Sequence, residues 1–355
     1  MARIGARTQM MAAALGAVVV AGAVALSGLV RADDPGPPAT AAELFGGPPG
    51  VVLGTGPGTS TAAPTSIVSS TVSSVRPAAP NPTPATPAPA KPAVRPGGFP
   101  QPANTGVLPG VALTVVSGDQ TFGTSGQVVE GKDFHGFVTV TGKNVTFRNC
   151  VFRGRAPTGN AALFDAEKAS GTVVEDSEFA PASPTATIDD IWAAHATILR
   201  ANIHGGVDGA KAGTGTVIQD SWIHDMSWFA HDPNQGGGET HNDGVQSFPG
   251  ESNVTLRHNT IDMSTTKNAN AAWQSSARDS RAENNLVDGG GCTFNFDHNA
   301  VGGPLTGISL VGNRFGRHSG FQCPILLSTQ TTLAQNSGNV WSDTGGPIPE
   351  PQRHD

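Results

Sequence analysis

From residue 129 onward, apolar residues recur in pairs five positions apart, and the positions between them are mostly small or polar. Helices would need longer stretches with a period of 3.6 residues, and we find none. Repeats of 20–50 residues that combine short strands with Gly, Asn and Ser turns are typical of solenoids. The pattern therefore predicts a stack of short-stranded coils. Its copies are Val129 to Phe134, Phe147 to Phe152, Val174 to Phe179, Ile198 to Ile203, Ile218 to Ile223, Leu256 to Ile261, Ala282 to Val287, Leu310 to Phe315 and, weakly, Gln335 to Val340.

The fourth position of each copy predicts a ladder inside the solenoid. Coils stack at ~4.8 Å, so equivalent positions lie above one another. Asn259, Asn285 and Asn313 take this position in consecutive copies, and Gly338 takes it in the last. We expect the three amides to hydrogen-bond along the axis and to adopt the left-handed backbone that the turn needs. The closing apolar residues would fill the bore, and we place four of the tryptophans, Trp192, Trp222, Trp273 and Trp341, in the core or at its ends.

The strand-turn pattern, seen in NVTFRNCVF (144–152) and NVTLRHNTI (253–261), resembles that of the pectate-lyase-like right-handed parallel β-helix superfamily. The resemblance implies an all-β, single-stranded right-handed parallel β-helix of about nine coils over residues 111–345, with a C-terminal tail at 346–355. It implies no particular activity, because this fold carries lyases, hydrolases, epimerases, adhesins and inert spikes. The motif series of polygalacturonases and of typical pectate lyases are missing. Asp189-Asp190 and Asn242-Asp243 only resemble the former, in reversed order.

Two segments precede the solenoid. Arg3 and Arg7 come before an apolar run from Met10 to Val30, which fits either an export signal ending at residue 32 or a retained membrane anchor. Residues 33–110 are dense in Pro, Ala and Thr, so we expect a disordered linker. The protein should therefore be secreted or otherwise extracytoplasmic and monomeric, and should touch a membrane only through an uncleaved N-terminal segment.

The net charge of the chain limits the classes of molecule that it can bind. The net charge is −7, and the acid excess lies in the predicted solenoid. An acidic domain repels phosphate backbones, so we expect no nucleic-acid partner. No Gly-rich loop joins a strand to a helix, which excludes Rossmann and P-loop enzymes.

The cysteines offer one candidate disulfide. Cys292 and Cys323 each precede a predicted strand, one coil apart, which could bring their Cα atoms within bonding range. Export would favour the bond, and two separate buried thiols are the alternative. Cys150 lies on the small-residue ladder and is expected to be inert.

One interval between repeats is longer than the rest. The extra residues between Ile223 and Ile261 should emerge as a loop from Asp225 to His241, which contains Trp228. Long loops on a rigid scaffold often carry function. Half of the ten histidines lie in or beside this stretch.

Two Asp-Gly motifs adjoin the loop. Asp208 to Lys211 and Asp243 to Gln246 have the same form, so in neighbouring coils Asp208 would stack beside Asp243 and Lys211 beside Gln246. Two carboxylates so close either hold a cation or share a proton. Calcium is the expected ion, with Asp225 as a third ligand. Alternatively, both aspartates only bond their own turns.

Three functions remain open. A polysaccharide lyase would cleave an acidic glycan by β-elimination, with Lys211 or His241 as base and the aspartates as cation ligands. A glycoside hydrolase would use Asp208 and Asp243 as acid and base. A non-catalytic cell-surface protein would only bind a glycan. In each case the substrate contacts would come from the polar and aromatic side chains Gln246, Trp228, His224 and His204.

Overall fold

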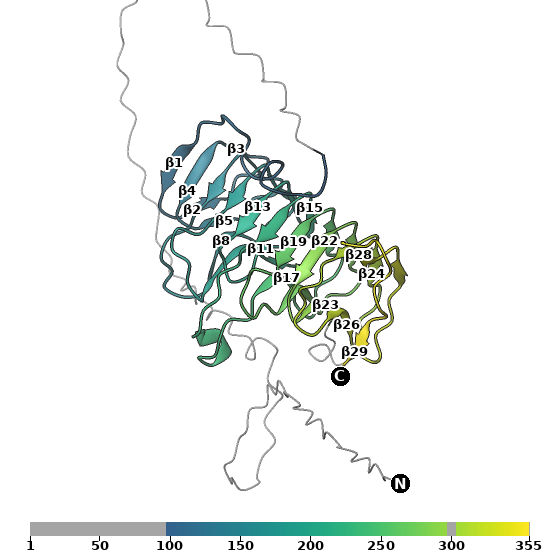
Figure 1. Ribbon diagram of the computed structural model, residues 1–355. Helices are drawn as coiled ribbons and strands as arrows, with labels where there is room; N and C mark the ends of the chain where they lie inside the picture. Colours follow the sequence, from purple (N-terminus) through teal and green to yellow (C-terminus); the bar gives the residue numbers. More distant parts are fainter. Residues whose placement is uncertain (1–96, 297–302, 355) are drawn as a thin grey trace, which may run out of the picture. The chain divides into compact units, whose positions relative to one another are not determined.

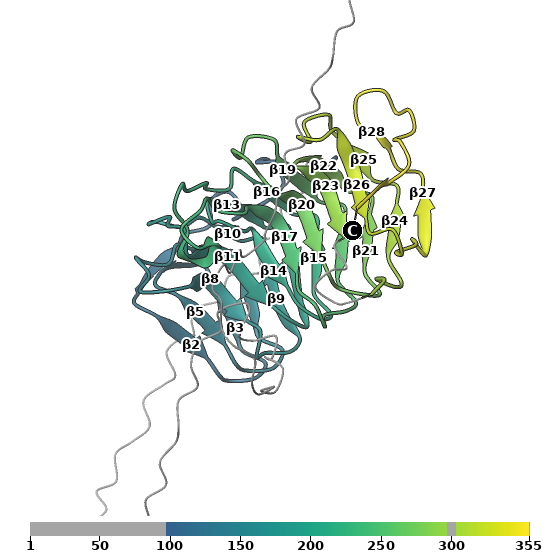
Figure 2. The ribbon, with the colours of Figure 1, turned by 90° about the horizontal axis from the view of Figure 1, so that it is seen from below.

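The computed structural model describes residues 97–296 and 303–354, and these form three parallel β-sheets (Figure 1). The chain passes from sheet A to sheet B to sheet C and then re-enters sheet A one coil further on. Figure 2 shows the same stacked strands from below. The predicted all-β right-handed parallel β-helix is therefore confirmed.

Each sheet takes one strand from nearly every coil. Sheet A consists of β1 (Thr114–Ser117), β4 (Lys132–His135), β7 (Val151–Phe152), β10 (Glu178–Phe179), β13 (Asn202–His204), β16 (Trp222–His224), β19 (Thr260–Met263), β22 (Leu286–Gly289), β25 (Arg314–Phe315) and β28 (Val340–Trp341). Sheet B consists of β2 (Gln120–Phe122), β5 (Val138–Val140), β8 (Ala161–Ala166), β11 (Ile188–Ala193), β14 (Ala210–Ala212), β17 (Asp243–Ser247), β20 (Ala271–Ser275), β23 (Cys292–Phe296), β26 (Cys323–Leu327) and β29 (Gln352–Arg353). Sheet C consists of β3 (Val128–Glu130), β6 (Thr146–Arg148), β9 (Thr172–Glu175), β12 (Ala196–Leu199), β15 (Val217–Gln219), β18 (Thr255–Arg257), β21 (Arg281–Glu283), β24 (Ser309–Val311) and β27 (Gln335–Ser337). A short 3₁₀ turn, η1 (Pro233–Gln235), lies in the insertion before β17.

The folded region is longer than predicted at both ends. Phe99 stacks on the His258 ring at 5.3 Å, and the Gly106 N–H donates to the Arg200 carbonyl, so residues 97–110 belong to the fold and not to the linker. At the other end β29 pairs with β26 beyond the expected boundary at residue 345. The sheets accordingly hold 10, 10 and 9 strands, where about nine coils were expected.

The predicted export signal and most of the linker lie outside the described residues. Within the described part of the chain, no helix is long and apolar enough to span a membrane.

The bore is filled as the repeat predicts. Phe134, Phe152 and Phe179 are wholly buried, pair in register along sheet A, and stack with ring centroids 5.4 and 4.7 Å apart. The predicted last copy of the repeat, Gln335 to Val340, begins one residue too early. Phe315 pairs with Trp341, not with Val340, because Asn339 and not Gly338 continues the ladder.

The asparagine ladder is confirmed. Asn285 Oδ1 accepts from the backbone N–H and the Nδ2 of Asn259, at 2.9 and 3.1 Å, and Asn285 Nδ2 donates to Leu256 O and Asn313 Oδ1, at 3.0 and 2.9 Å. Asn339 extends the ladder by one more coil. The expectation that these residues are left-handed was wrong. The left-handed conformation belongs to the residue before each of them, for example His258 with φ 49° and Asn284 with φ 55°.

The corner between sheets C and A has a constant form. From β6 onward, two residues separate each sheet C strand from the next sheet A strand, and the first of the two has a positive φ. The residues of this left-handed column are Asn149, Asp176, Arg200, Asp220, His258, Asn284, Gly312 and Gly338. Because this corner has the same length in each of these coils, it keeps the strands of consecutive coils in register.

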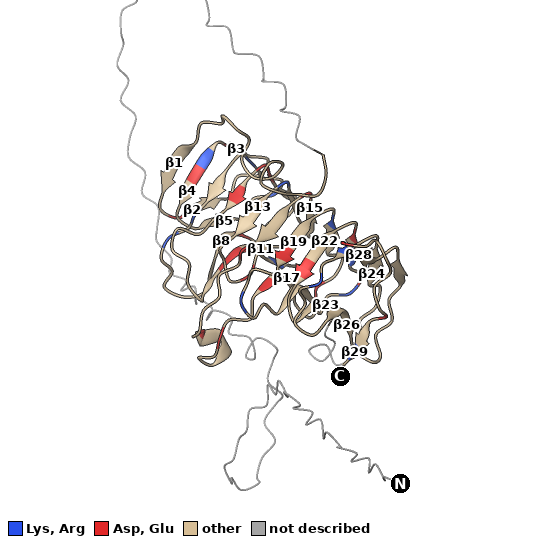
Figure 3. Cartoon of the chain, in the orientation of Figure 1, with Lys and Arg blue, Asp and Glu red and all other residues tan. Residues whose placement is uncertain are grey.

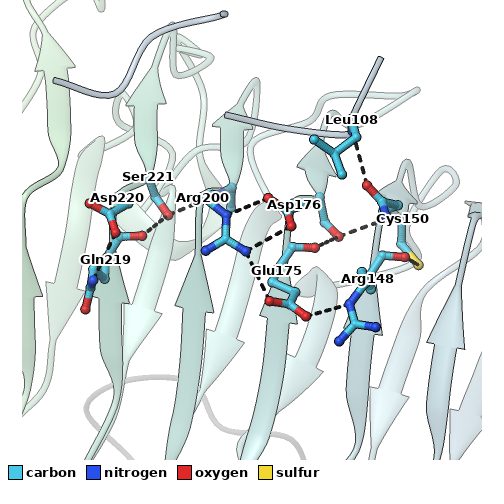
Figure 4. A network of polar contacts seen from close by, with 12 residues as sticks. Leu108, Arg148, Cys150, Glu175, Asp176, Arg200, Gln219, Asp220 and Ser221 are labelled. Atoms are coloured by element: carbon cyan, nitrogen blue, oxygen red, sulfur yellow. Dashed lines mark hydrogen bonds and ion pairs between the residues drawn. The ribbon is translucent and has the colours of Figure 1, made fainter. Parts of the chain in front are cut away.

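Charged side chains tie the N-terminal coils together at this corner (Figure 4). Arg200 donates to Asp176 at 2.6 Å and to Glu175 at 3.1 Å, and Arg148 donates to the other oxygen of Glu175 at 2.6 Å. The Leu108 N–H donates to Asn149 Oδ1, which attaches the N-terminal segment to the same corner.

The disulfide between Cys292 and Cys323 is present, and its Cα atoms lie 4.6 Å apart on adjacent strands. Cys150 is a buried free thiol on the ladder, and burial raises its pKa, as suits an inert role.

We expect a Cys292→Ser, Cys323→Ser double variant to be less stable by about 3–4 kcal/mol, because the bond closes a loop with a sequence separation of 31. Urea denaturation monitored by circular dichroism measures the loss. Reducing the wild-type protein should reproduce it, and an unchanged midpoint after reduction would contradict the prediction.

Candidate functional site

The two Asp-Gly motifs place their aspartates at one edge of sheet B. Asp208 precedes β14, and Asp243 is the first residue of β17. A Cβ on Gly209 would lie 2.7 Å from Ile223 Cγ2, and one on Gly244 would lie 2.7 Å from the Ala272 carbonyl oxygen. Only glycine fits where the backbone approaches the core this closely. Each glycine thus takes the inward position, and Lys211 and Gln246 lie partly exposed two residues further on.

Lys211 joins two carboxyl groups on that face. Its Nζ donates to Asp189 Oδ2 at 2.5 Å and lies 3.7 Å from Asp208 Oδ2. Asp189 also accepts from Trp192 Nε1 at 2.7 Å and from the Asp208 N–H at 3.3 Å. The Lys211 side chain is 25 % exposed, whereas those of Asp189 and Asp208 are 7 % and 5 % exposed. The lysine thus covers both acids.

The acids continue along the solenoid axis. Asp208 Oδ1 accepts the Asp243 N–H at 2.9 Å, and Asp243 Oδ1 accepts from Asn270 Nδ2 at 3.0 Å. Asp190 is fully buried beneath Gly206, whose N–H it accepts at 3.4 Å. Asp190 Oδ1 and Asp243 Oδ2 are buried with no hydrogen-bond partner among the described residues. We call Asp189, Asp190, Asp208, Asp243 and Lys211 the acid cluster.

Burial dominates the protonation of the acid cluster. It raises the pKa of Asp208 to about 7, with a further contribution from the Asp189 charge. Burial also raises the pKa values of Asp190 and Asp243 well above the usual range, and neighbouring carboxylates add to both. For Lys211 burial acts to lower the pKa, but the charges of Asp189 and Asp208 outweigh it and the pKa is raised. Lys211 is therefore protonated, and Asp208 exchanges its proton near neutral pH.

The surroundings are acidic as well. Burial is the main cause of the raised pKa of Glu167. The charges of Asp165 and Glu251 raise it further, and that of Lys211 lowers it. Figure 3 shows the acidic residues of β11 and β17 in red on sheet B. Carboxyl groups outnumber cations in this part of the surface.

The predicted insertion borders the site. Asn242 is fully buried, and its Nδ2 donates to the carbonyls of Val207 and Ser227, both at 2.8 Å. It therefore fastens the insertion to the turn that carries Asp208. Further along, Asn234 and Asn160 exchange hydrogen bonds at 3.0 Å, which links the insertion to the loop before β8.

Of the predicted site residues, the structure brings Lys211, Asp208, Asp243 and Gln246 to sheet B, where Lys211 pairs with Gln246 in register. His241 is exposed at the end of the insertion. Trp228 donates to Glu239 and lies under Lys267 Nζ, 3.4 Å from its ring centroid.

His204 and His224 lie elsewhere, on sheet A. Their rings stack at 5.0 Å, His204 pairs with Glu178, and His224 pairs with Asp225 and Asn202. Their contacts are thus with sheet A and its adjoining turns, and none of these involves the acid cluster.

The three predicted calcium ligands do not come together. Calcium takes six to eight oxygen ligands, but no three His, Cys, Asp or Glu side chains of residues 97–296 and 303–354 are arranged to hold a metal ion. Asp225, the expected third ligand, bonds instead to His224 and Thr265, away from Asp208 and Asp243.

Sequence reasoning missed Asp189, Asp190 and Asn270 as site residues, and it placed Trp192 in the core or at one of its ends. Trp192 pairs in register with Lys211 on the outer face, whereas Trp273 is fully buried as expected. Asp189 and Asp190 could have been found by aligning their coil with the next one. Asp189-Asp190 precedes the apolar Ile191 that pairs with Ala210, just as Asp208-Gly209 precedes Ala210 itself.

The aspartates of the acid cluster are buried beneath the partly exposed Lys211 side chain on this face. Two hollows of about 430 and 480 Å³ lie elsewhere on the described residues, one at the first coil around Phe122 and one between the loops at Glu251 and Pro304. Neither is lined by a member of the acid cluster.

We expect stability to fall as pH rises from 5 to 8. A carboxyl whose pKa is raised in the folded state binds more protons there than in the unfolded chain, so each pH step up to that pKa weakens the fold. For Asp208, with a pKa of about 7 against an ordinary 3.8, the loss is about 3 kcal/mol. Urea midpoints at pH 5 and 8 measure it.

Asp208→Asn should reduce this pH dependence. Asp343→Asn is the matched control, because Arg317 lowers the pKa of that exposed carboxyl and its titration falls below this pH range. A wild-type protein that gains stability between pH 5 and 8 would contradict the burial of un-ionised acids.

No protein-family model matches the sequence, and no curated protein matches it either. Among solved structures the chain is similar to the pectate lyase Pel9A, with 13 % identity and a TM-score of 0.43 over 67 % of this chain and 72 % of that one. It is also similar to the fluoroquinolone resistance protein QnrB1, at 11 % and 0.27 over 65 % and 91 %, and to Dettilon tailspike protein, at 11 % and 0.27 over 68 % and 60 %. The fold rests on the strand pairing itself, which makes the described residues of this chain a parallel β-helix.

Proposed function

We propose that the protein is a glycoside hydrolase that cleaves a neutral polysaccharide on the outer face of sheet B. The observation that carries the proposal is the pair of carboxyl groups, Asp189 and Asp208, held on either side of Lys211 Nζ. Paired carboxyl groups are the usual catalytic groups of glycoside hydrolysis. Export would bring such an enzyme to extracellular polysaccharides.

Asp208 is suited to the role of general acid. Its pKa of about 7 lets it hold a proton at neutral pH and release that proton to a leaving glycosidic oxygen. Asp189 would supply the second carboxylate. The two N–O distances to Lys211 keep their nearest oxygens within about 6 Å, which is below the ~6.5–9.5 Å separation of inverting enzymes and therefore favours retention.

A retaining reaction would take two steps. In the first, the Asp189 carboxylate attacks the anomeric carbon while Asp208 gives its proton to the leaving oxygen, and the glycosidic bond breaks. In the second, Asp208 removes a proton from water as that water displaces Asp189. Because Lys211 covers both acids, its flexible side chain must swing aside to admit the sugar.

The state of Lys211 favours hydrolysis over β-elimination. A lyase would use this lysine as base, but its raised pKa keeps it protonated. Lys211 is also already paired with Asp189 and Asp208, so a polyuronate would have to break these contacts to place its carboxylate beside the lysine. A neutral glycan carries no such penalty.

Product analysis tests the proposal. The protein should be incubated with neutral polysaccharides, including β-1,4-glucan, mannan and xylan, and with polygalacturonate. We expect new reducing ends from a neutral glycan, with retained anomeric configuration by NMR, and no absorbance from unsaturated sugar. An unsaturated product from polygalacturonate would identify a lyase, and binding without cleavage would identify a non-catalytic glycan-binding protein.

A further inference from the structure

We infer that Gln246, Gln274 and Asn295, the amide row, bind the hydroxyl groups of a linear neutral glycan laid along the solenoid axis at one sugar per coil. This inference rests on the proposed function and names the residues that select its substrate. It also predicts that more sugar units bind on one side of the acid cluster than on the other.

The register aligns these side chains. Lys211 pairs with Gln246, Gln246 with Gln274, and Gln274 with Asn295. All are partly exposed, whereas the residues before and after each one are buried in the sheet. The amides therefore form one column on the outer face of sheet B, continuing directly from Lys211.

The amide row has hydrogen-bonding capacity left over. The Gln246 side chain makes no hydrogen bond to another described residue, and Gln274 Oε1 has one long contact, 3.5 Å from Asn270 Nδ2. Asn295 Oδ1 is buried without a partner among residues 97–296 and 303–354. An amide offers two donors and an acceptor with no net charge, which matches the hydroxyl groups of a neutral sugar.

The spacing suits an extended glycan. Neighbouring strands of a sheet lie ~4.8 Å apart, comparable with the length of one pyranose unit in an extended chain. Three amides in successive coils can thus contact three successive sugars. Leu326 follows Asn295 in the column and ends the amide row.

The acid cluster lies at one end of this column. On its N-terminal side the column continues with Trp192 and then with Asp165, which has no aromatic face and already accepts a hydrogen bond from the Glu167 N–H. We therefore expect one strong sugar site on that side, over Trp192, and three on the amide side. A glycan of four or more units would be needed for full activity.

Binding to an inactive protein tests the amide row separately from catalysis. Cellohexaose, mannohexaose, xylohexaose and hexagalacturonate should be titrated calorimetrically into Asp208→Asn. We expect at least one neutral hexaose to bind and hexagalacturonate not to bind. We expect Gln274→Ala in the same background to weaken the binding of the neutral hexaose about tenfold, the loss of one or two hydrogen bonds.

Matched variants keep the result interpretable. Gln335→Ala removes an exposed glutamine on sheet C and should leave binding unchanged. Asn295→Ala should act like Gln274→Ala, and the thermal midpoint of each variant confirms that it folds. Three outcomes would overturn the inference: binding of hexagalacturonate alone, binding of none of the four hexaoses, or equal binding by Asp208→Asn with and without Gln274→Ala.

The active protein separates this inference from the proposed function. With a cleavable hexaose, Gln274→Ala should raise KM about tenfold and leave kcat unchanged, while a disaccharide glycoside should be cleaved equally by both proteins. Cleavage that ignores the amide row would refute the inference alone. Binding that depends on the amide row without any cleavage would refute the hydrolase.

Discussion

Asp208→Asn is expected to lower the kcat for glycan cleavage by about 10³-fold, within the ~10²–10⁴ that general acid catalysis contributes. The amide keeps the size of the side chain but has no proton of suitable pKa to give to the leaving oxygen. KM should change little, because the amide row and Trp192 remain in place. Steady-state kinetics on the glycan identified by product screening measures both constants.

The pH profile gives this prediction a second measurement. Wild-type activity should decline as the pH rises past about 7, where Asp208 loses its proton, and the residual activity of the variant should lack that decline. Asp225→Asn is the matched control, since that carboxylate bonds to His224 and Thr265 on sheet A. We expect it, and EDTA, to leave the rate unchanged. Full activity in Asp208→Asn would remove Asp208 from the mechanism.

Asn285→Leu is expected to destabilise the protein by about 4 kcal/mol. Leucine has nearly the same size, but it cannot replace the four hydrogen bonds that Asn285 makes within the buried ladder. The Asn259 N–H would lose its partner in a site closed to water, and Asn259 Nδ2 and Asn313 Oδ1 would each keep only one of two bonds. Each such loss costs ~1–3 kcal/mol, part of which relaxation of the coil recovers. Equilibrium urea unfolding measures the change.

Asn160→Leu is the control for the ladder. Asn160 is exposed and exchanges hydrogen bonds only with Asn234, itself exposed, so its loss should cost less than ~0.5 kcal/mol. Equal costs at Asn160 and Asn285 would mean that burial of the amide is not what makes the ladder stabilising.

The fold could be predicted because solenoid packing repeats the same demand in every coil. Phe152, Phe179 and Ile203 meet one another in the bore, so each must be apolar, and the sequence displays that requirement as a period. The repeat stops predicting the register at the end of the solenoid, where no further coil of the described chain packs against the residues. At the last coil, Val340 is a plausible apolar residue in the wrong register, and only the continuation of the ladder to Asn339 decides the alignment.

The candidate site was predicted only in part, because pairing across coils does not determine what each side chain does. Asp208, Lys211 and Asp243 were found through their repeated motif. Asp189 has no such motif, and its role depends on Lys211 reaching back one coil to it, a choice of side-chain conformation that spacing does not reveal. Likewise, the sequence places Asp225 beside the insertion, but its local bond to His224 holds it on sheet A.

The left-handed column has a consequence for how such a protein can diversify. A corner of two residues with one obligatory positive φ tolerates neither insertion nor deletion, so mutations that change chain length are selected against there. The other two corners vary in length, from two residues before β23 to eighteen before β17. Both flank the outer face of sheet B. Loops of new length can therefore be inserted at these two corners without breaking the coil, so they are the places to engineer a new specificity on this scaffold.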